Sequence, residues 1–168
     1  TEAATIKGTD GTAAAAEPPK PTPEEEDKAA LLAFYQARGD APLWVDTNGL
    51  PPKARAAIAE LQRAAVWGLD PADFTLSADP GPGTPSPESL ATAETELSLA
   101  VMAYARHARG GRIPEPAKQL SSYLDRKPQY RDRAGLLDDL AKSDDPARVL
   151  VDLHPKHPEF ERLRQAWL

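Results

Sequence analysis

The 168-residue sequence contains no cysteine. Its residues therefore supply no thiolate, which excludes a cysteine nucleophile and cysteine metal ligands within this chain. The absence neither requires nor excludes an oxidising compartment. The sequence also lacks any apolar run close to the roughly 20 residues that cross a bilayer. Sustained period-two alternation and repeats of solenoid type are missing as well, so we expect neither a β-sheet nor a repeat protein.

Basic charge is scarce in the first part of the chain. The whole sequence has 20 basic and 26 acidic residues, a formal net charge of -6. Residues 1–100 carry 7 basic and 16 acidic side chains, whereas residues 101–168 carry 13 and 10. An acidic chain without a concentrated basic face argues against nucleic acid as a partner. The basic C-terminal part could still meet an anionic partner locally.

Composition divides the chain into a tail and one domain. Residues 1–26 are rich in alanine, threonine, proline and acid, and the prolines between Glu17 and Pro23 disfavour a helix. We therefore expect a disordered N-terminal tether over residues 1–26, although an ordinary ragged terminus would look the same. Residues 27–168 are long enough for a single domain with its own core. A tether of this kind would suit an export signal or membrane anchor upstream.

The rest of the sequence predicts an all-α fold of five to seven helices. Apolar residues recur at spacings of three and four, and proline or acid at helix starts and glycine at helix ends mark the boundaries. The longest helix is expected from about Glu88 to Arg109, while Ser77–Pro87 and Leu120–Tyr130 are expected to be loops. The other predicted helical segments are Pro23–Arg38, Pro52–Trp67, a short turn after Asp70, Arg133–Lys142, Pro146–Leu153 and Pro158–Leu168. The predicted core is Phe34, Tyr35, Trp44, Ile58, Leu61, Leu69, Leu97, Val101, Tyr104 and Leu137.

A basic corner closes the longest helix. Gly110 and Gly111 are expected to stop it, with Arg106 and Arg109 in its last turn and Arg112 just beyond. Guanidinium groups bind carboxylates, so this corner is the one candidate interaction site. The interpretation we favour is that the arginines complement the helix end and pair internally with acids such as Glu94, Glu96 or Asp70. The alternative is contact with another domain or with the carboxylates of a ligand, with the arginines exposed by their place in the last turn.

Three histidines are candidate metal ligands or surface groups. His154 and His157 have a spacing that a metal site tolerates, but two prolines interrupt any helix there and no cysteine completes a ligand set. We therefore predict a polar turn and no metal or other cofactor. His107 lies between Arg106 and Arg109, which favours its neutral form, and we expect it on the surface.

A hydrolytic pair of carboxylates is not evident. Glu94 and Glu96 are two residues apart and point to different sides of a helix, and the other acids are expected in solvated turns or tails. The aromatic residues Tyr35, Trp44, Trp67 and Tyr104 could stack on sugars, yet all four fall at positions that a helical core would occupy.

Four short motifs occur in order: Phe34-Tyr-x-x-Arg38, Pro42-Leu-Trp44, Gly68-Leu-Asp-Pro71, and a Tyr104-Ala-Arg helix that ends in Gly111-Arg-Ile-Pro114. Together they resemble the helical scaffold domain that precedes the catalytic domain in large periplasmic L,D-transpeptidases, enzymes that cross-link peptidoglycan. The likeness covers most of residues 31–168, and the segment Leu153–Arg164 resembles the family's exit toward a peptidoglycan-binding module. The family's chemistry uses a catalytic cysteine and a histidine, and this chain lacks the cysteine.

The resemblance implies a non-catalytic periplasmic scaffold. Such a domain would brace the catalytic and peptidoglycan-binding domains of its parent chain, and its partners would be peptidoglycan, cell-wall synthesis proteins or that catalytic domain. Two alternatives are a helical peptidoglycan hydrolase and a free-standing adaptor for cell-wall synthesis proteins.

Overall fold

The computed structural model describes residues 20–77 and 85–168 of the chain. In these two ranges it has seven α-helices, two short 3-10 helices and no β-strand beyond one isolated bridge, which confirms the all-α prediction. No helix in them is long and apolar enough to span a membrane. The α-helices are α1 (Pro23–Ala37), α2 (Pro52–Gln62), α3 (Pro87–Ala108), α4 (Pro116–Gln119), α5 (Arg133–Lys142), α6 (Pro146–Val151) and α7 (Pro158–Trp167), and the 3-10 helices are η1 (Ala64–Trp67) and η2 (Pro71–Phe74).

Helix α1 begins earlier than the domain boundary drawn from composition. Thr22 accepts a hydrogen bond from the Glu25 backbone, and the Glu25 side chain in turn accepts one from the Thr22 backbone N–H, so the pair forms a capping box. Pro23 fits the first helical position because its missing N–H would have no partner there. Helix α1 therefore starts at Pro23, as its own sequence signals predict, within the range 1–26 that composition assigns to the tether. Residues 1–19 of the predicted tether lie outside the part of the chain that the structure describes.

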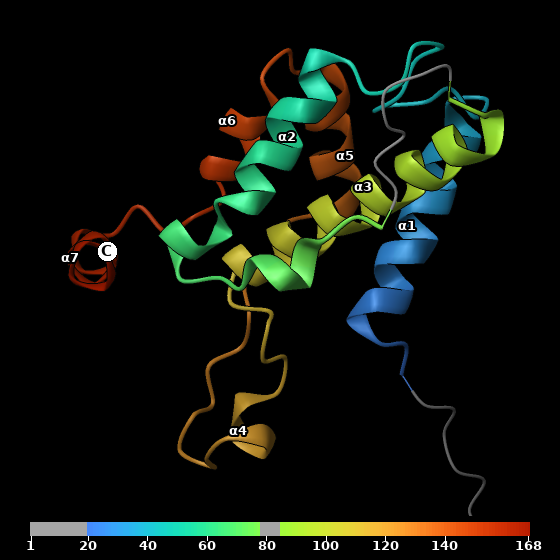
Figure 1. The fold of residues 1–168 in the computed structure, drawn as a ribbon. Helices are drawn as coiled ribbons and strands as arrows, with labels where there is room; N and C mark the ends of the chain where they lie inside the picture. The colour runs from blue at the N-terminus through green and yellow to red at the C-terminus, as the bar shows by residue number, and fades with distance from the viewer. Residues whose placement is uncertain (1–19, 78–84) are drawn as a thin grey trace, which may run out of the picture.

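Helix α3 is the central element of the fold. It contacts α1, α2, α6 and η2, and Figure 1 shows it crossing the body between α1 and α2. Ser86 caps it, and Leu97, Val101 and Tyr104 are fully buried along it. These three positions share one face of the helix, and Met102, which is also buried, lies on another side, so α3 has neighbours on more than one side. The fold is consequently organised around one long buried helix.

The core has a larger and a smaller part. The larger part joins α2, α3, α5 and α6 and contains Trp44. The smaller part packs α1 against α3 and α5 through Phe34, Met102 and Leu137. Seven of the ten predicted core residues are buried, namely Phe34, Trp44, Leu61, Leu97, Val101, Tyr104 and Leu137. The other three, Tyr35, Ile58 and Leu69, are only partly buried and pack on the edges of the core.

Two segments stand away from this core. Residues 113–131, which we call the arm, connect α3 to α5 and carry α4, a short helix that the sequence analysis did not predict; Figure 1 shows the arm projecting from the helical body. Helix α7 lies at the opposite edge from α1 in the same view. It is held by the Trp167 side chain, whose Nε1 donates to the Ala65 carbonyl at 3.0 Å, and by the Arg164 guanidinium over the Trp67 ring.

Candidate functional site

Arg106, the first residue of the basic corner, is buried rather than exposed. Only 9% of its side-chain surface is accessible. Its guanidinium pairs with Asp27 at 3.2 Å and with Glu24 at 2.9 Å, both in the first turns of α1. The expectation that the corner's arginines are exposed is therefore wrong at this position, because α1 packs across the end of α3 and covers it.

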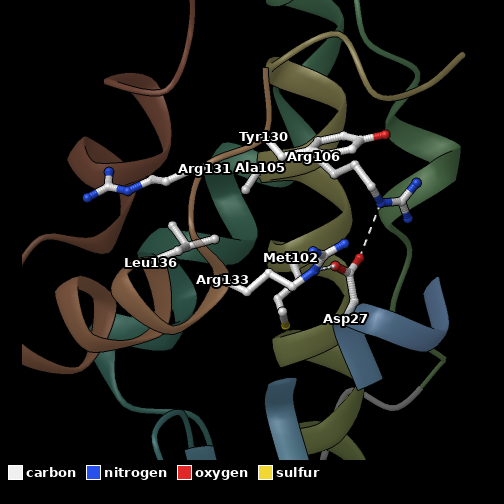
Figure 2. Close-up of a pocket in the computed structure, with 8 residues that line it drawn as sticks. All are labelled: Asp27, Met102, Ala105, Arg106, Tyr130, Arg131, Arg133 and Leu136. Carbon is white, nitrogen blue, oxygen red and sulfur yellow. Dashed lines mark hydrogen bonds and ion pairs between the residues drawn. The ribbon is translucent and has the colours of Figure 1, made fainter. Parts of the chain in front are cut away.

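Asp27 is shared between two arginines. Its second oxygen accepts from Arg133 Nε of α5 at 2.6 Å, and Arg133 also pairs with Glu26 at 2.8 Å. Figure 2 shows Asp27 between Arg106 and Arg133 at the side of a small cavity, with the Tyr130 ring near Arg106. Three guanidinium groups line this cavity: those of Arg106 and Arg133 pair with carboxylates from α1, and that of Arg131 pairs with Asp139 of α5. The cluster therefore joins α1, α3 and α5 and offers no unpaired charge to a ligand.

Arg109 holds the returning part of the arm. Its Nε donates to the Gln129 carbonyl at 3.0 Å, and the Gln129 N–H donates to the Arg109 carbonyl at 3.2 Å. Arg109 is the C-cap residue of α3, and its carbonyl, which has no partner within the helix, accepts this bond from Gln129. The second corner arginine thus connects the end of α3 to the arm.

Arg112 pairs with two acids at the short helix η2. Its guanidinium lies 3.3 Å from Asp73 and 3.8 Å from Asp70, the residue that caps η2. Of the three acids expected to pair with the corner, only Asp70 does so. Glu94 and Glu96 bind other groups because they lie two to four helical turns away from the corner on α3.

His107 lies beside this ion pair and is largely covered. Its ring is packed edge-on against Phe74, and its Nδ1 is 3.6 Å from Asp73. Burial is the main cause that lowers the pKa of His107, and the neighbouring Arg106 guanidinium lowers it further. The expected neutral form agrees with this direction. The expected surface position is wrong, because η2 folds over the ring.

The two glycines of the corner have different roles. Gly110 has φ +85°, a backbone conformation that glycine adopts without strain, and it ends α3 as predicted. Gly111 has no positive φ but no room for a side chain, since a Cβ there would overlap the Tyr130 ring and Arg106. Tyr130 can therefore pack directly on the backbone at the base of the arm.

A buried carboxylate that the sequence analysis did not recognise organises the loop after α1. Glu94 accepts hydrogen bonds from the backbone N–H groups of Leu43, Trp44 and Val45 at 2.6, 2.8 and 2.9 Å, and also from the Tyr35 hydroxyl. Ser98, one turn on, accepts from Trp44 Nε1 at 3.0 Å. Burial, followed by the hydrogen bond to Glu94, raises the pKa of Tyr35. Glu94 thus fixes the Pro-Leu-Trp loop to α3.

A second buried polar group connects α2, α3 and the segment before α7. The Tyr104 hydroxyl lies 2.7 Å from His154 Nε2 and donates to Glu60 at 3.2 Å, and Glu60 also accepts from Trp67 Nε1 at 2.8 Å. The Trp67 and His154 rings are stacked. His154 was expected in a polar turn, but it is buried, and burial lowers its pKa to about 4.

The structure does not bring the histidines together as a metal site. His157 caps α7 by accepting a hydrogen bond from the Glu159 backbone, while His154 faces Tyr104. In the described ranges, no group of three or more histidine, aspartate or glutamate residues is placed to hold a metal ion.

Comparison with known proteins places this arrangement in a family. No curated protein and no solved structure matches the chain. A family model described as "Scaffold domain" matches residues 29–166, which include every helix from the middle of α1 to the end of α7 apart from its last residue. The chain therefore belongs to the Scaffold domain family.

Proposed function

We propose that the chain is the non-catalytic scaffold domain of a periplasmic L,D-transpeptidase. In this role it braces the catalytic and peptidoglycan-binding domains and helps to place peptidoglycan or partner proteins for cell-wall remodelling. The observation that carries the proposal is the family match over residues 29–166 on a chain that also has the four motifs of the transpeptidase scaffold in order.

The places of these motifs in the fold support a bracing role. Tyr35 and Trp44, from the first two motifs, meet at Glu94 and Ser98 on α3. Asp70 of the third motif meets Arg112 of the fourth. The motif residues therefore hold segments of the chain to one another, which is what a rigid support requires.

The buried carboxylates of the chain also favour a structural role over that of a hydrolase. Glu94 receives four internal hydrogen bonds, Glu60 is bonded to Trp67 and Tyr104, and Asp27 is held by two arginines. A general acid must reach the bond that it protonates. Because these carboxylates are used inside the fold, we favour the scaffold over the alternative of a helical peptidoglycan hydrolase. The chemistry would come from the cysteine-containing domain of the parent enzyme.

The proposal predicts a measurable association with that domain. The chain would be titrated by calorimetry with the purified cysteine-containing catalytic domain of an L,D-transpeptidase from the same genome. We expect a Kd of about 10 μM or tighter, equivalent to roughly 7 kcal/mol. An unrelated acidic helical protein of the same size is the control. Absence of binding at concentrations ten times higher would contradict the bracing role and favour the adaptor alternative.

A further inference from the structure

The end of the arm exposes three large apolar side chains. Leu120, Tyr123 and Leu124 are 61, 93 and 44% accessible, in a part of the molecule far from the core. The Leu124 N–H donates to the Ser121 carbonyl at 2.9 Å, which closes a tight turn directly after Leu120 that contains Tyr123 and Leu124. We call Leu120, Tyr123 and Leu124 the arm tip. Apolar groups gathered on a projecting turn are unfavourable in water and are typical of a contact surface.

The base of the arm is fixed on the helical body. Gln129 is bonded twice to Arg109, Tyr130 packs on Gly111, and Arg131 pairs with Asp139 of α5. These contacts come from Arg109 and Gly111, just after the end of α3, and from α5. A tip presented from a fixed base loses less conformational entropy on binding than a free loop would.

The charged residues next to the arm tip indicate the sign of the charge on the partner's surface. The arm contains Lys118, Arg126, Lys127 and Arg131 but only two acids, Glu115 and Asp125. Lys118 pairs with Glu115 at 2.6 Å and Arg131 pairs with Asp139, whereas Arg126 and Lys127 are exposed and form no ion pair in the described ranges. On a chain of net charge -6 this is a local basic surface. A complementary partner has carboxylates beside its apolar contact.

We propose that the arm tip docks into an apolar pocket bordered by carboxylates on a folded protein domain, and that this domain is the transpeptidase catalytic domain of the proposed function, on which the inference rests. Tyrosine and arginine are the residue types that carry most energy in protein interfaces. The tip is convex and includes two leucines, so it fits a concave protein pocket. A surface that binds a sugar polymer is instead expected to be a groove lined with hydrogen-bonding groups, which the arm tip is not.

Two variants test the inference in the full chain. A tip variant replaces the three apolar residues (L120S, Y123S, L124S), and a charge variant reverses the two unpaired cations (R126E, K127E). The matched controls are L32S, which changes an equally exposed leucine on α1, and K20E with K28E, which reverses two exposed lysines. All four should melt within about 2 °C of the parent chain, because surface changes alter stability little.

The affinity of each variant for the catalytic domain is measured by calorimetric titration. The tip variant should bind at least about tenfold more weakly, as the loss of a hot spot predicts. The charge variant should bind more weakly at low salt and show a flatter salt dependence, since its screened attractions are gone. Both controls should bind as the parent does.

The other outcomes each contradict a defined part of the account. Parent-like binding by the tip variant would overturn the arm inference and leave the scaffold function standing, whereas no binding by the parent chain would overturn both. Sedimentation of each variant with purified sacculi tests the glycan partner: loss of sacculus binding by the tip variant, with catalytic-domain binding intact, would overturn the protein partner. A parent dimer that the tip variant abolishes would assign the tip to self-association instead.

Discussion

Arg109 and Gln129 are joined by two hydrogen bonds, one from the Arg109 side chain and one to its backbone carbonyl. This pair ties the end of the central helix to the arm. Arg106 ties the same helix end to α1, and Arg112 ties it to η2. The basic corner is therefore a junction at which α1, η2 and the returning end of the arm are fixed to the end of α3.

The three corner arginines should contribute unequally to stability. Arg106→Gln leaves the buried Asp27 with one arginine, and we expect it to lower the free energy of unfolding by about 3 kcal/mol. Arg112→Gln removes a half-exposed pair and should cost less than about 1 kcal/mol. Urea unfolding of each variant measures both values. Equal losses of unfolding free energy in the two variants would contradict the argument that the buried ion pair contributes more than the exposed one.

Glu94 should be a structural residue despite its buried carboxylate. Glu94→Gln removes the charge that accepts three backbone N–H bonds and replaces one acceptor oxygen by a donor. We expect a loss of about 3 kcal/mol, the upper range for hydrogen bonds to a charged group. Glu88→Gln, on the exposed start of the same helix, is the matched control and should unfold as the parent does. A Glu94→Gln variant of parental stability would show that the loop is fixed by other contacts.

His154 should make the chain less stable as the pH falls. Burial lowers its pKa to about 4 from the usual 6.5, with a smaller effect from Arg164. Between these values the unfolded state binds a proton that the folded state does not, so the contribution present above pH 6.5 is lost toward pH 4. The loss is on the order of 3 kcal/mol. Tyr104, whose hydroxyl lies 2.7 Å from the ring, and Arg164 are unchanged in the variant that tests this.

The measurement compares unfolding of His154→Gln and His157→Gln with the parent at pH 5, 6 and 7. His157 is exposed, so its variant should keep the parental slope, whereas His154→Gln should be less stable at pH 7 and flatter below it. All other ionisable groups are the same in the three proteins, so their contributions cancel in the comparison. An unchanged slope in His154→Gln would contradict the burial of a neutral ring.

Local signals predicted the helices well because their causes are local. Thr22 with Pro23, and Asp70 with Pro71, specify helix starts through the caps that the structure shows. The apolar spacing of α3 predicted its length and its buried face. The short α4 was missed because four residues carry too little periodicity to be recognised.

The partners within the corner could not be predicted because they are set by packing. Arg106 meets Asp27, 79 residues away in sequence, and Glu94 meets the backbone of Leu43 across 51 residues. His154 was assigned to a solvated turn because its neighbours are proline and lysine, yet the turn folds back so that Tyr104 receives the ring. Each of these polar residues is buried with a partner that only the tertiary fold supplies.

The most direct test of a non-catalytic scaffold is turnover by the chain itself. Purified chain would be incubated with tetrapeptide-containing muropeptides, and cross-linked dimers would be quantified by mass spectrometry, with the cysteine-containing catalytic domain as positive control. Because the chain has no thiol, we predict no dimers above a control without protein. Cross-linked dimers formed by the chain alone would contradict the scaffold account.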